Sequence, residues 1–113
     1  MHGLSAARNL IDAAKTTAAG RGLVRVTKLV VSVGEVFEVD AREVRLCFNL
    51  LKKGDPVMGS CRLTIEPRAA RFCCDSCGQT FGLESSGRCP GCGSSRISLV
   101  DGNEILLLSV EGE

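Results

Sequence analysis

The sequence is poor in aromatic residues and nearly balanced in charge. Its 113 residues include four Phe but no Trp or Tyr, and the formal net charge is +1. So weak a net charge gives no field that would hold a phosphate backbone or a membrane surface. The chain also lacks the run of about 18 apolar residues that a membrane-spanning helix requires. Its first residues, Met1 to Ser5, have neither the basic nor the apolar region of a signal peptide.

Cysteine, in contrast, is abundant. The chain has seven cysteines, and an odd number argues against a simple disulfide framework. Four of them form two C-x-x-C pairs in a chain that shows no secretion signal. Such pairs indicate thiolate ligands in a reducing compartment, so we expect a cytoplasmic protein.

Two segments have the apolar periodicity of helices. In the segment 4–19, small and aliphatic residues recur at helical spacing, and Gly20 and Gly22 follow as a stop. The second helix should begin after Asp40, with Glu43 three residues on, as in a capping box. Its apolar stripe consists of Val44, Cys47, Phe48 and Leu51.

Three segments are predicted to be strands. The segment 23–33 is rich in Val and Thr, and an alternating pattern would place Val24, Val26 and Val30 on one face. The segment 62–66 alternates polar and apolar residues, and the segment 104–110 is largely apolar.

The last predicted strand must bury its apolar faces, and the cysteine-rich segment before it offers little core. We therefore expect this strand to return to the first sheet. The predicted fold is α/β (α+β), with two helices on a three-stranded sheet and an inserted four-cysteine zinc-ribbon lobe. The first domain would comprise residues 1–66 plus 102–113, and the zinc-ribbon domain residues 67–101.

The cysteine pairs are spaced as in a zinc ribbon. Cys74 and Cys77 form the first pair, Cys89 and Cys92 the second, and a glycine follows each. Two such knuckles can direct four thiolates at one metal ion, with Zn–S distances of about 2.3 Å. A site made only of sulfur has no open position, which is typical of structural zinc. Two disulfides, a redox pair and a rubredoxin-like iron site are the alternatives.

The other three cysteines carry no ligand signal. Cys73 has the wrong spacing to Cys77 and should be a strand residue that faces away from the metal. Cys47 lies on the apolar stripe of the second helix and should be a small core residue. Cys61 precedes a predicted strand.

Nucleic-acid binding is the alternative function for a zinc ribbon. Residues 68–100 contain four arginines and two acidic residues. A zinc ion with four thiolates adds two negative charges, so the lobe would be nearly neutral, whereas phosphate binding requires several uncompensated cations. A transcription accessory module is therefore the weaker hypothesis.

His2 is the only histidine of the chain. The α-amine of Met1, the amide nitrogen of His2 and its imidazole Nδ1 could close a five-membered and a six-membered chelate ring. Nitrogen donors in a square plane suit Ni(II) and Cu(II). Binding must displace the amine and amide protons, so affinity should rise with pH. A solvated terminal side chain is the alternative reading.

Motifs along almost the whole chain resemble those of the HypA/HybF family of hydrogenase maturation factors. They are the opening Met1-His2-x-Leu4-Ser5, Val33-Gly34-Glu35, Val39-Asp40 with Phe48, Lys53-Gly54, Ile65-Glu66, the two cysteine knuckles and the segment 105–111.

The resemblance implies a nickel metallochaperone that binds Ni(II) through His2 and carries structural Zn(II). It implies a HypB-type GTPase and the large subunit of nickel–iron hydrogenase as partners, and in some organisms urease maturation. No phosphate loop or catalytic constellation accompanies these motifs, so we expect no enzyme activity. Exposed strand edges are compatible with a monomer or a weak homodimer.

The chain departs from the family pattern at one position. The family usually begins Met-His-Glu, whereas here Gly3 follows His2. The fourth nickel ligand is therefore left open between Asp40, Glu35 and a group from a second protein.

Overall fold

The computed structural model describes residues 2–113 and has two lobes. Its maximum extents are 54 × 27 × 17 Å. The elements in chain order are α1 (His2–Gly20), β1 (Val26–Gly34), α2 (Ala41–Lys52), β2 (Arg62–Arg68), β3 (Arg71–Cys74), β4 (Thr80–Phe81), the 3₁₀ helix Leu83–Ser85, β5 (Ile97–Asp101) and β6 (Ile105–Gly112).

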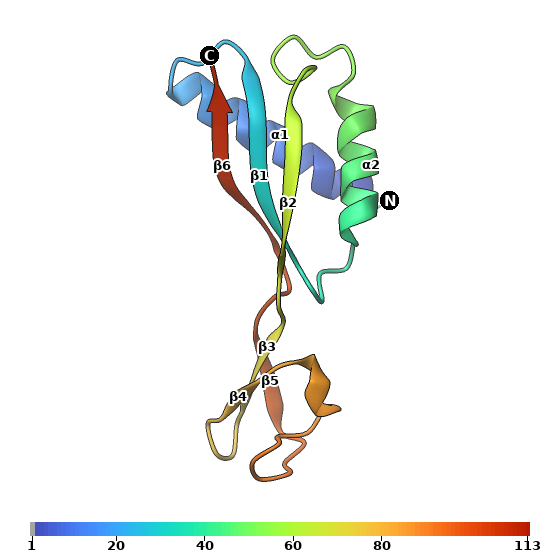
Figure 1. The fold of residues 1–113 in the computed structure, drawn as a ribbon, viewed down its shortest axis with the longest axis vertical. Coiled ribbons are helices and arrows are strands. Elements are labelled where there is room, and N and C mark those ends of the chain that lie inside the picture. Colours follow the sequence, from blue (N-terminus) through green and yellow to red (C-terminus); the bar gives the residue numbers. More distant parts are fainter. Residues whose placement is uncertain (1) are drawn as a thin grey trace.

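The first lobe is a three-stranded sheet with two helices on one face (Figure 1). Its strand order is β2-β1-β6, so the last strand of the chain pairs with the first, as predicted. β1 and β2 run parallel because α2 carries the chain back between them, whereas β1 and β6 run antiparallel. We call α1, β1, α2, β2 and β6 the sheet lobe.

The core of the sheet lobe is aliphatic, as the composition required. α1 contributes mainly alanines with Leu10 and Ile11, and α2 contributes Val44, Cys47 and Phe48. The Asp40 carboxylate accepts a hydrogen bond from the backbone N–H of Glu43 at 2.9 Å and so caps α2. The predicted cap and buried stripe of the second helix are therefore confirmed.

The predicted alternation is wrong at the start of β1. Val24, which was expected to share a buried face with Val26, is 75% exposed, whereas Val26 is fully buried. The register against β6 shifts between Val26 and Lys28, and such an irregularity restarts the alternation of side chains. Val26 consequently lies in the same core as Leu29.

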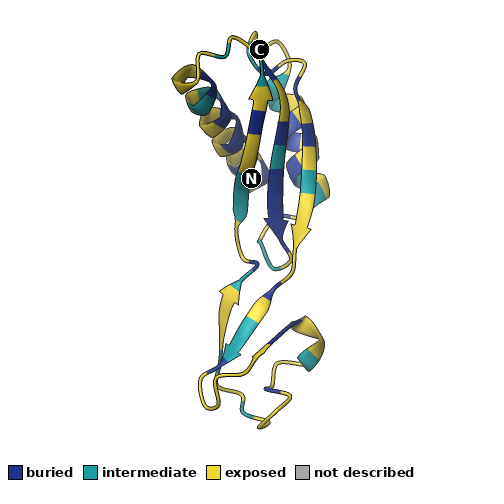
Figure 2. Cartoon of the chain, turned by 60° about the vertical axis from the view of Figure 1, so that its left-hand side comes forward, coloured by how far each residue is buried: buried dark blue, intermediate teal, exposed yellow. Residues whose placement is uncertain are grey.

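The second lobe is a smaller sheet of order β4-β3-β5 at the end of the molecule opposite the helices (Figure 1). Together with its connecting turns we call it the cysteine lobe. Its buried core is only Cys74, Phe81 and Cys89, against which Phe72 and Ile97 pack. Figure 2 shows the contrast, with buried residues concentrated in the sheet lobe and mostly exposed residues in the cysteine lobe.

Two chain segments link the lobes, one from β2 to β3 and one from β5 to β6. The loop after β1 is hydrogen-bonded to both. Glu35 N donates to Arg68 O at 2.8 Å, and Val36 N donates to Gly102 O at 2.9 Å. The Glu35 carboxylate also accepts from Ala70 N at 2.9 Å. This loop therefore fastens the end of the central strand to both linking segments.

Among residues 2–113, no helix combines the length and the apolarity needed to cross a bilayer.

Replacing Phe48 with Ala should lower the free energy of unfolding by about 3–5 kcal/mol, because this ring is fully buried and its loss leaves a cavity. Urea denaturation of the sheet lobe measures the change. Leu50→Ala is the matched control on the same helix: its side chain is 51% exposed, so the change should stay within about 0.5 kcal/mol. Equal effects in the two variants would contradict the assigned core.

Candidate metal centres

The cysteine lobe contains two turns of the same construction. In the first, Gly78 N donates to Cys74 O at 2.9 Å, and in the second Gly93 N donates to Cys89 O at 2.9 Å. Gly78 has φ of 81° and Gly93 has φ of 76°, values that favour glycine. The glycine after each pair is thus explained by the backbone of the turn.

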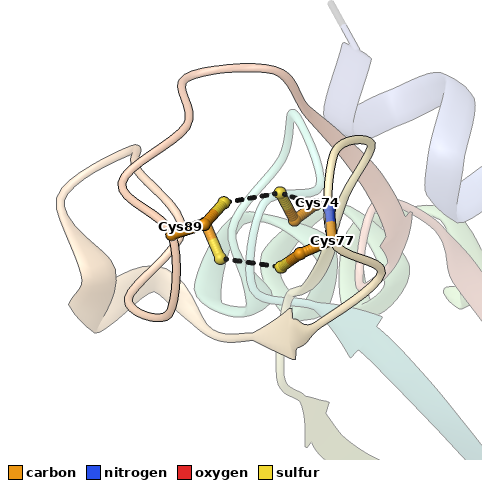
Figure 3. Close-up of side chains that lie close together, drawn as sticks. Cys74, Cys77 and Cys89 are labelled. Atoms are coloured by element: carbon orange, nitrogen blue, oxygen red, sulfur yellow. Dashed lines mark hydrogen bonds between the residues drawn. The ribbon is translucent and has the colours of Figure 1, made fainter.

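Both turns aim their sulfur atoms at one place (Figure 3). The Sγ atoms of Cys74, Cys77, Cys89 and Cys92 all lie within 4.8 Å of one another. Cys74 Sγ is 3.6 Å from Cys92 Sγ, and Cys77 Sγ is 3.5 Å from Cys89 Sγ. A tetrahedral zinc ion with Zn–S bonds of about 2.3 Å requires sulfur separations of about 3.8 Å, so the arrangement fits zinc. The contacts are far longer than the roughly 2.0 Å of a disulfide.

The remaining cysteines lie outside this cluster. Cys73 is half-buried in β3, with its Sγ 3.7 Å from the carbonyl oxygen of Gly78. Cys47 and Cys61 are buried in the core of the sheet lobe, and burial raises the pKa of the Cys61 thiol. The predictions for Cys47 as a core residue and for Cys73 as a strand residue outside the metal cluster are confirmed.

The four clustered thiols divide into two acidic and two weakly acidic groups. The backbone N–H of Cys77 points at Cys74 Sγ and lowers the pKa of Cys74 to about 6. Backbone N–H groups of Cys92 and Gly91 likewise lower the pKa of Cys89. Each acidic thiol faces a partner that keeps its proton, because a second thiolate at this distance would repel the first.

Cys77 and Cys92 are those partners. The backbone N–H of Gln79 works against the shift, but the adjacent Cys89 sulfur and burial outweigh it and raise the pKa of Cys77 to about 12. For Cys92 the N–H of Ser94 lowers the pKa, and the Cys74 side chain and burial raise it on balance. At neutral pH the metal-free cluster should therefore hold Cys74 mainly as a thiolate and Cys77 as a thiol.

Three of the four arginines in residues 68–100 contact other groups of the protein. Arg68 Nε lies 2.8 Å from Asp101 Oδ1 and lowers the pKa of that carboxyl group. Arg71 donates to the hydroxyl of Thr80 at 3.1 Å, and Arg88 donates to the carbonyl of Gly93 at 3.2 Å. Three of the four predicted cations thus have partners within the chain, and this arrangement does not favour a phosphate-binding surface.

The second candidate centre lies at the start of α1, beside α2 (Figure 1). His2 is the first residue of α1 described, and its side chain is 77% exposed. Its Nδ1 lies 3.5 Å from Oε1 of Glu38, which is itself 62% exposed. Met1, whose amine completes the predicted chelate, lies outside the described residues. Glu38 belongs to no recognisable sequence motif. It lies near His2 because of the path that the loop before α2 takes.

The two carboxylates considered from the sequence have other partners. Asp40 caps α2, and Glu35 accepts from Ala70 N at the junction of the lobes. A Cβ added to Gly3 would overlap the Glu43 side chain, so the glycine leaves room for a carboxylate from α2. Gly3 is therefore explained by packing between α1 and α2.

The fold and the cysteine cluster define a two-lobed protein with an α/β lobe and a zinc-ribbon-like lobe. A family model described as hydrogenase/urease nickel incorporation, metallochaperone, HypA matches residues 1–112. The chain belongs to this HypA family.

Individual relatives agree with the family model. The chain is 33% identical to the hydrogenase maturation factor HypA of Chlorobium luteolum and 31% identical to the hydrogenase maturation factor HybF of Klebsiella pneumoniae, with each chain covered completely. It also resembles the solution structure of the Ni metallochaperone HypA from Helicobacter pylori. That likeness has a TM-score of 0.75 and 25% identity, and covers 96% of this chain and 95% of the other.

Replacing Cys74 or Cys92 with Ala should release zinc and disorder the cysteine lobe, because three sulfur ligands leave the tetrahedron incomplete. Metal analysis after dialysis against a chelator, together with amide NMR spectra, measures both effects. Cys73→Ala is the control, since its sulfur lies outside the cluster, and it should keep about one zinc per chain. Full zinc retention in either ligand variant would overturn the assignment.

Zinc binding at pH 7 should release clearly fewer than four protons per chain, because Cys74 is already largely ionised and the pKa of Cys89 is also lowered. Calorimetry in buffers of different ionisation enthalpy gives this number. Affinity should fall as pH drops through about 6, where Cys74 takes up its proton. Release of about four protons would mean that the metal-free turns do not keep their hydrogen bonds.

Proposed function

We propose that this protein carries Ni(II) at its N-terminus and delivers it during maturation of nickel–iron hydrogenase. The observation on which this rests is the exposed imidazole of His2 at the start of α1, in a chain whose family model describes nickel incorporation. The ligands would be the Met1 amine, the His2 amide nitrogen and His2 Nδ1. The metal is cargo, so its site must remain accessible to an acceptor.

The start of a helix suits such a chelate. The first four N–H groups of an α-helix have no intrahelical acceptor. The amide nitrogen of His2 can therefore lose its proton and bind metal without the loss of a hydrogen bond from α1. The exposed imidazole can turn toward solvent or toward Glu38 by rotation of its own side chain. Loading then requires little movement of the fold.

The cysteine cluster would hold Zn(II) as a structural ion. Its four sulfur atoms leave no position for cargo, and the lobe has almost no apolar core to stabilise it otherwise. Bound zinc would supply much of the folding free energy of this lobe. We propose domain boundaries at 1–66 plus 102–113 for the nickel-binding part and at 67–101 for the zinc ribbon.

The proposed partners follow from family membership. They are a HypB-type GTPase, the large subunit of nickel–iron hydrogenase and, as a second acceptor system, a urease accessory protein. The chain itself would act as a carrier in the cytoplasm, as a monomer or weak homodimer, without catalysing a reaction. Neither nucleic acid nor a membrane has a place in this proposal.

Titration of zinc-loaded protein with Ni(II) should give about one equivalent bound with a diamagnetic square-planar spectrum. The protein must carry its native, untagged N-terminus. His2→Ala should abolish this binding, because it removes the imidazole and with it the six-membered chelate ring, which leaves only the amine and the amide nitrogen. Zinc content is the control and should not change. Nickel binding that survives the substitution would exclude His2 from the site.

A further inference from the structure

A divalent ion at the start of α1 is placed at the positive end of the helix dipole. The deprotonated amide of His2 cancels one charge of Ni(II), which leaves the complex with one positive charge. The first turn of α1 contains no acidic residue that could neutralise it. Gly3 has no side chain, so the missing negative charge must come from another element of the fold.

The loop between β1 and α2 provides a carboxylate at this point. Oε1 of Glu38 lies 3.5 Å from Nδ1 of His2, the imidazole atom that the chelate uses. Among the described carboxylates, Glu38 alone lies within ion-pair range of an imidazole nitrogen of His2. We propose that Glu38 is the fourth ligand of the N-terminal nickel ion, an inference that rests on the proposed function.

The position of Glu38 fits the coordination geometry. Two chelate rings through amine, amide and imidazole leave one corner of the square plane open, next to both the amine and Nδ1. With metal–ligand bonds of about 2.0 Å, neighbouring donors lie about 2.8 Å apart. Glu38 Oε1 at 3.5 Å is within reach of that corner, and its 62% exposed side chain is free to turn.

The other nearby carboxylates are less suited. Asp40 Oδ1 accepts the capping hydrogen bond of α2, and Glu35 Oε1 accepts from Ala70 N at the junction of the lobes. Glu43 packs over the Cα atom of Gly3 rather than beside the imidazole. Use of Asp40 or Glu35 would cost a hydrogen bond that stabilises the fold, whereas Glu38 has only its exposed contact with His2.

This ligand would also ease release. The three nitrogen donors belong to chelate rings, so each stays close to the metal when its own bond breaks. A carboxylate on a loop is held by one metal–oxygen bond and dissociates more easily. A donor atom of the acceptor protein can displace Glu38: one nickel–oxygen bond breaks as the new bond forms, and the carboxylate returns to solvent. The loop carboxylate is therefore the first position at which an acceptor would attach.

Nickel affinities of the zinc-loaded full chain, measured against a competing chelator, test this assignment. The variants are Glu38→Gln, the matched Glu43→Gln, which removes the same charge from a side chain beside Gly3, and His2→Ala. About 0.5 M KCl screens through-space effects of exposed charges but leaves a metal–ligand bond intact. In protein with ¹³C-labelled Glu carboxyl groups, the Glu38 resonance is identified by its absence from Glu38→Gln.

Glu38→Gln should weaken nickel binding at least about tenfold, since loss of even an outer-shell partner commonly costs that much. Glu43→Gln should stay within about threefold, and the Glu38 carboxyl resonance should shift on nickel addition. Equal losses in both Glu variants, or an unmoved resonance, would overturn the role of Glu38. If His2→Ala abolishes binding while Glu38→Gln leaves it unchanged, only this ligand is wrong. Nickel binding that is absent, or independent of His2, would overturn the proposed function as well.

Discussion

The structure depends on the hydrogen bonds that β1 makes on both of its edges. β1 pairs with β2 on one side and β6 on the other. The sheet lobe is therefore complete only when β6, the last strand, pairs with β1, the first. Both helices pack against the apolar residues of this strand. Beyond Gly34, where an added Cβ would overlap the backbone of Gly102, the chain turns into the loop that carries Glu38 to the start of α1. The candidate nickel site is therefore placed by the far end of the central strand.

Local sequence patterns predicted most of the fold. The helices, the return of the last strand and the cysteine cluster each have a short-range signal: apolar periodicity, a cap at Asp40, or C-x-x-C spacing with a glycine. The predictions fail where contacts between distant segments, and not the local pattern, decide which residues are buried or lie close together. Val24 alternates correctly in sequence but lies in an exposed bend before β1, and a bulge after Val26 changes which later residues share its face. Glu38 was missed because its closeness to His2 depends on the packing of α1 against the loop, which no periodicity encodes.

The two candidate metal centres have opposite chemical character. The cysteine cluster is closed, made of four soft sulfur donors that come from two rigid turns with matching hydrogen bonds. The start of α1 offers nitrogen and oxygen donors that are mostly exposed to solvent. Soft donors in a complete coordination shell favour a metal that stays, and exposed donors with an open position favour one that leaves. On the proposed function, the two donor sets would therefore select different metals, and zinc and nickel would not exchange.

The return of β6 to β1 also makes closure of the large sheet depend on the lobe that lies between them in the chain. Residues 69–104 separate the end of β2 from the start of β6, and until β6 arrives β1 has only one neighbouring strand. A metal bound by the four cysteines would hold the end of β3 beside the start of β5 and so shorten the loop that β6 must close. Availability of zinc during folding would then influence the yield of the folded sheet lobe, although that lobe contains none of the zinc ligands.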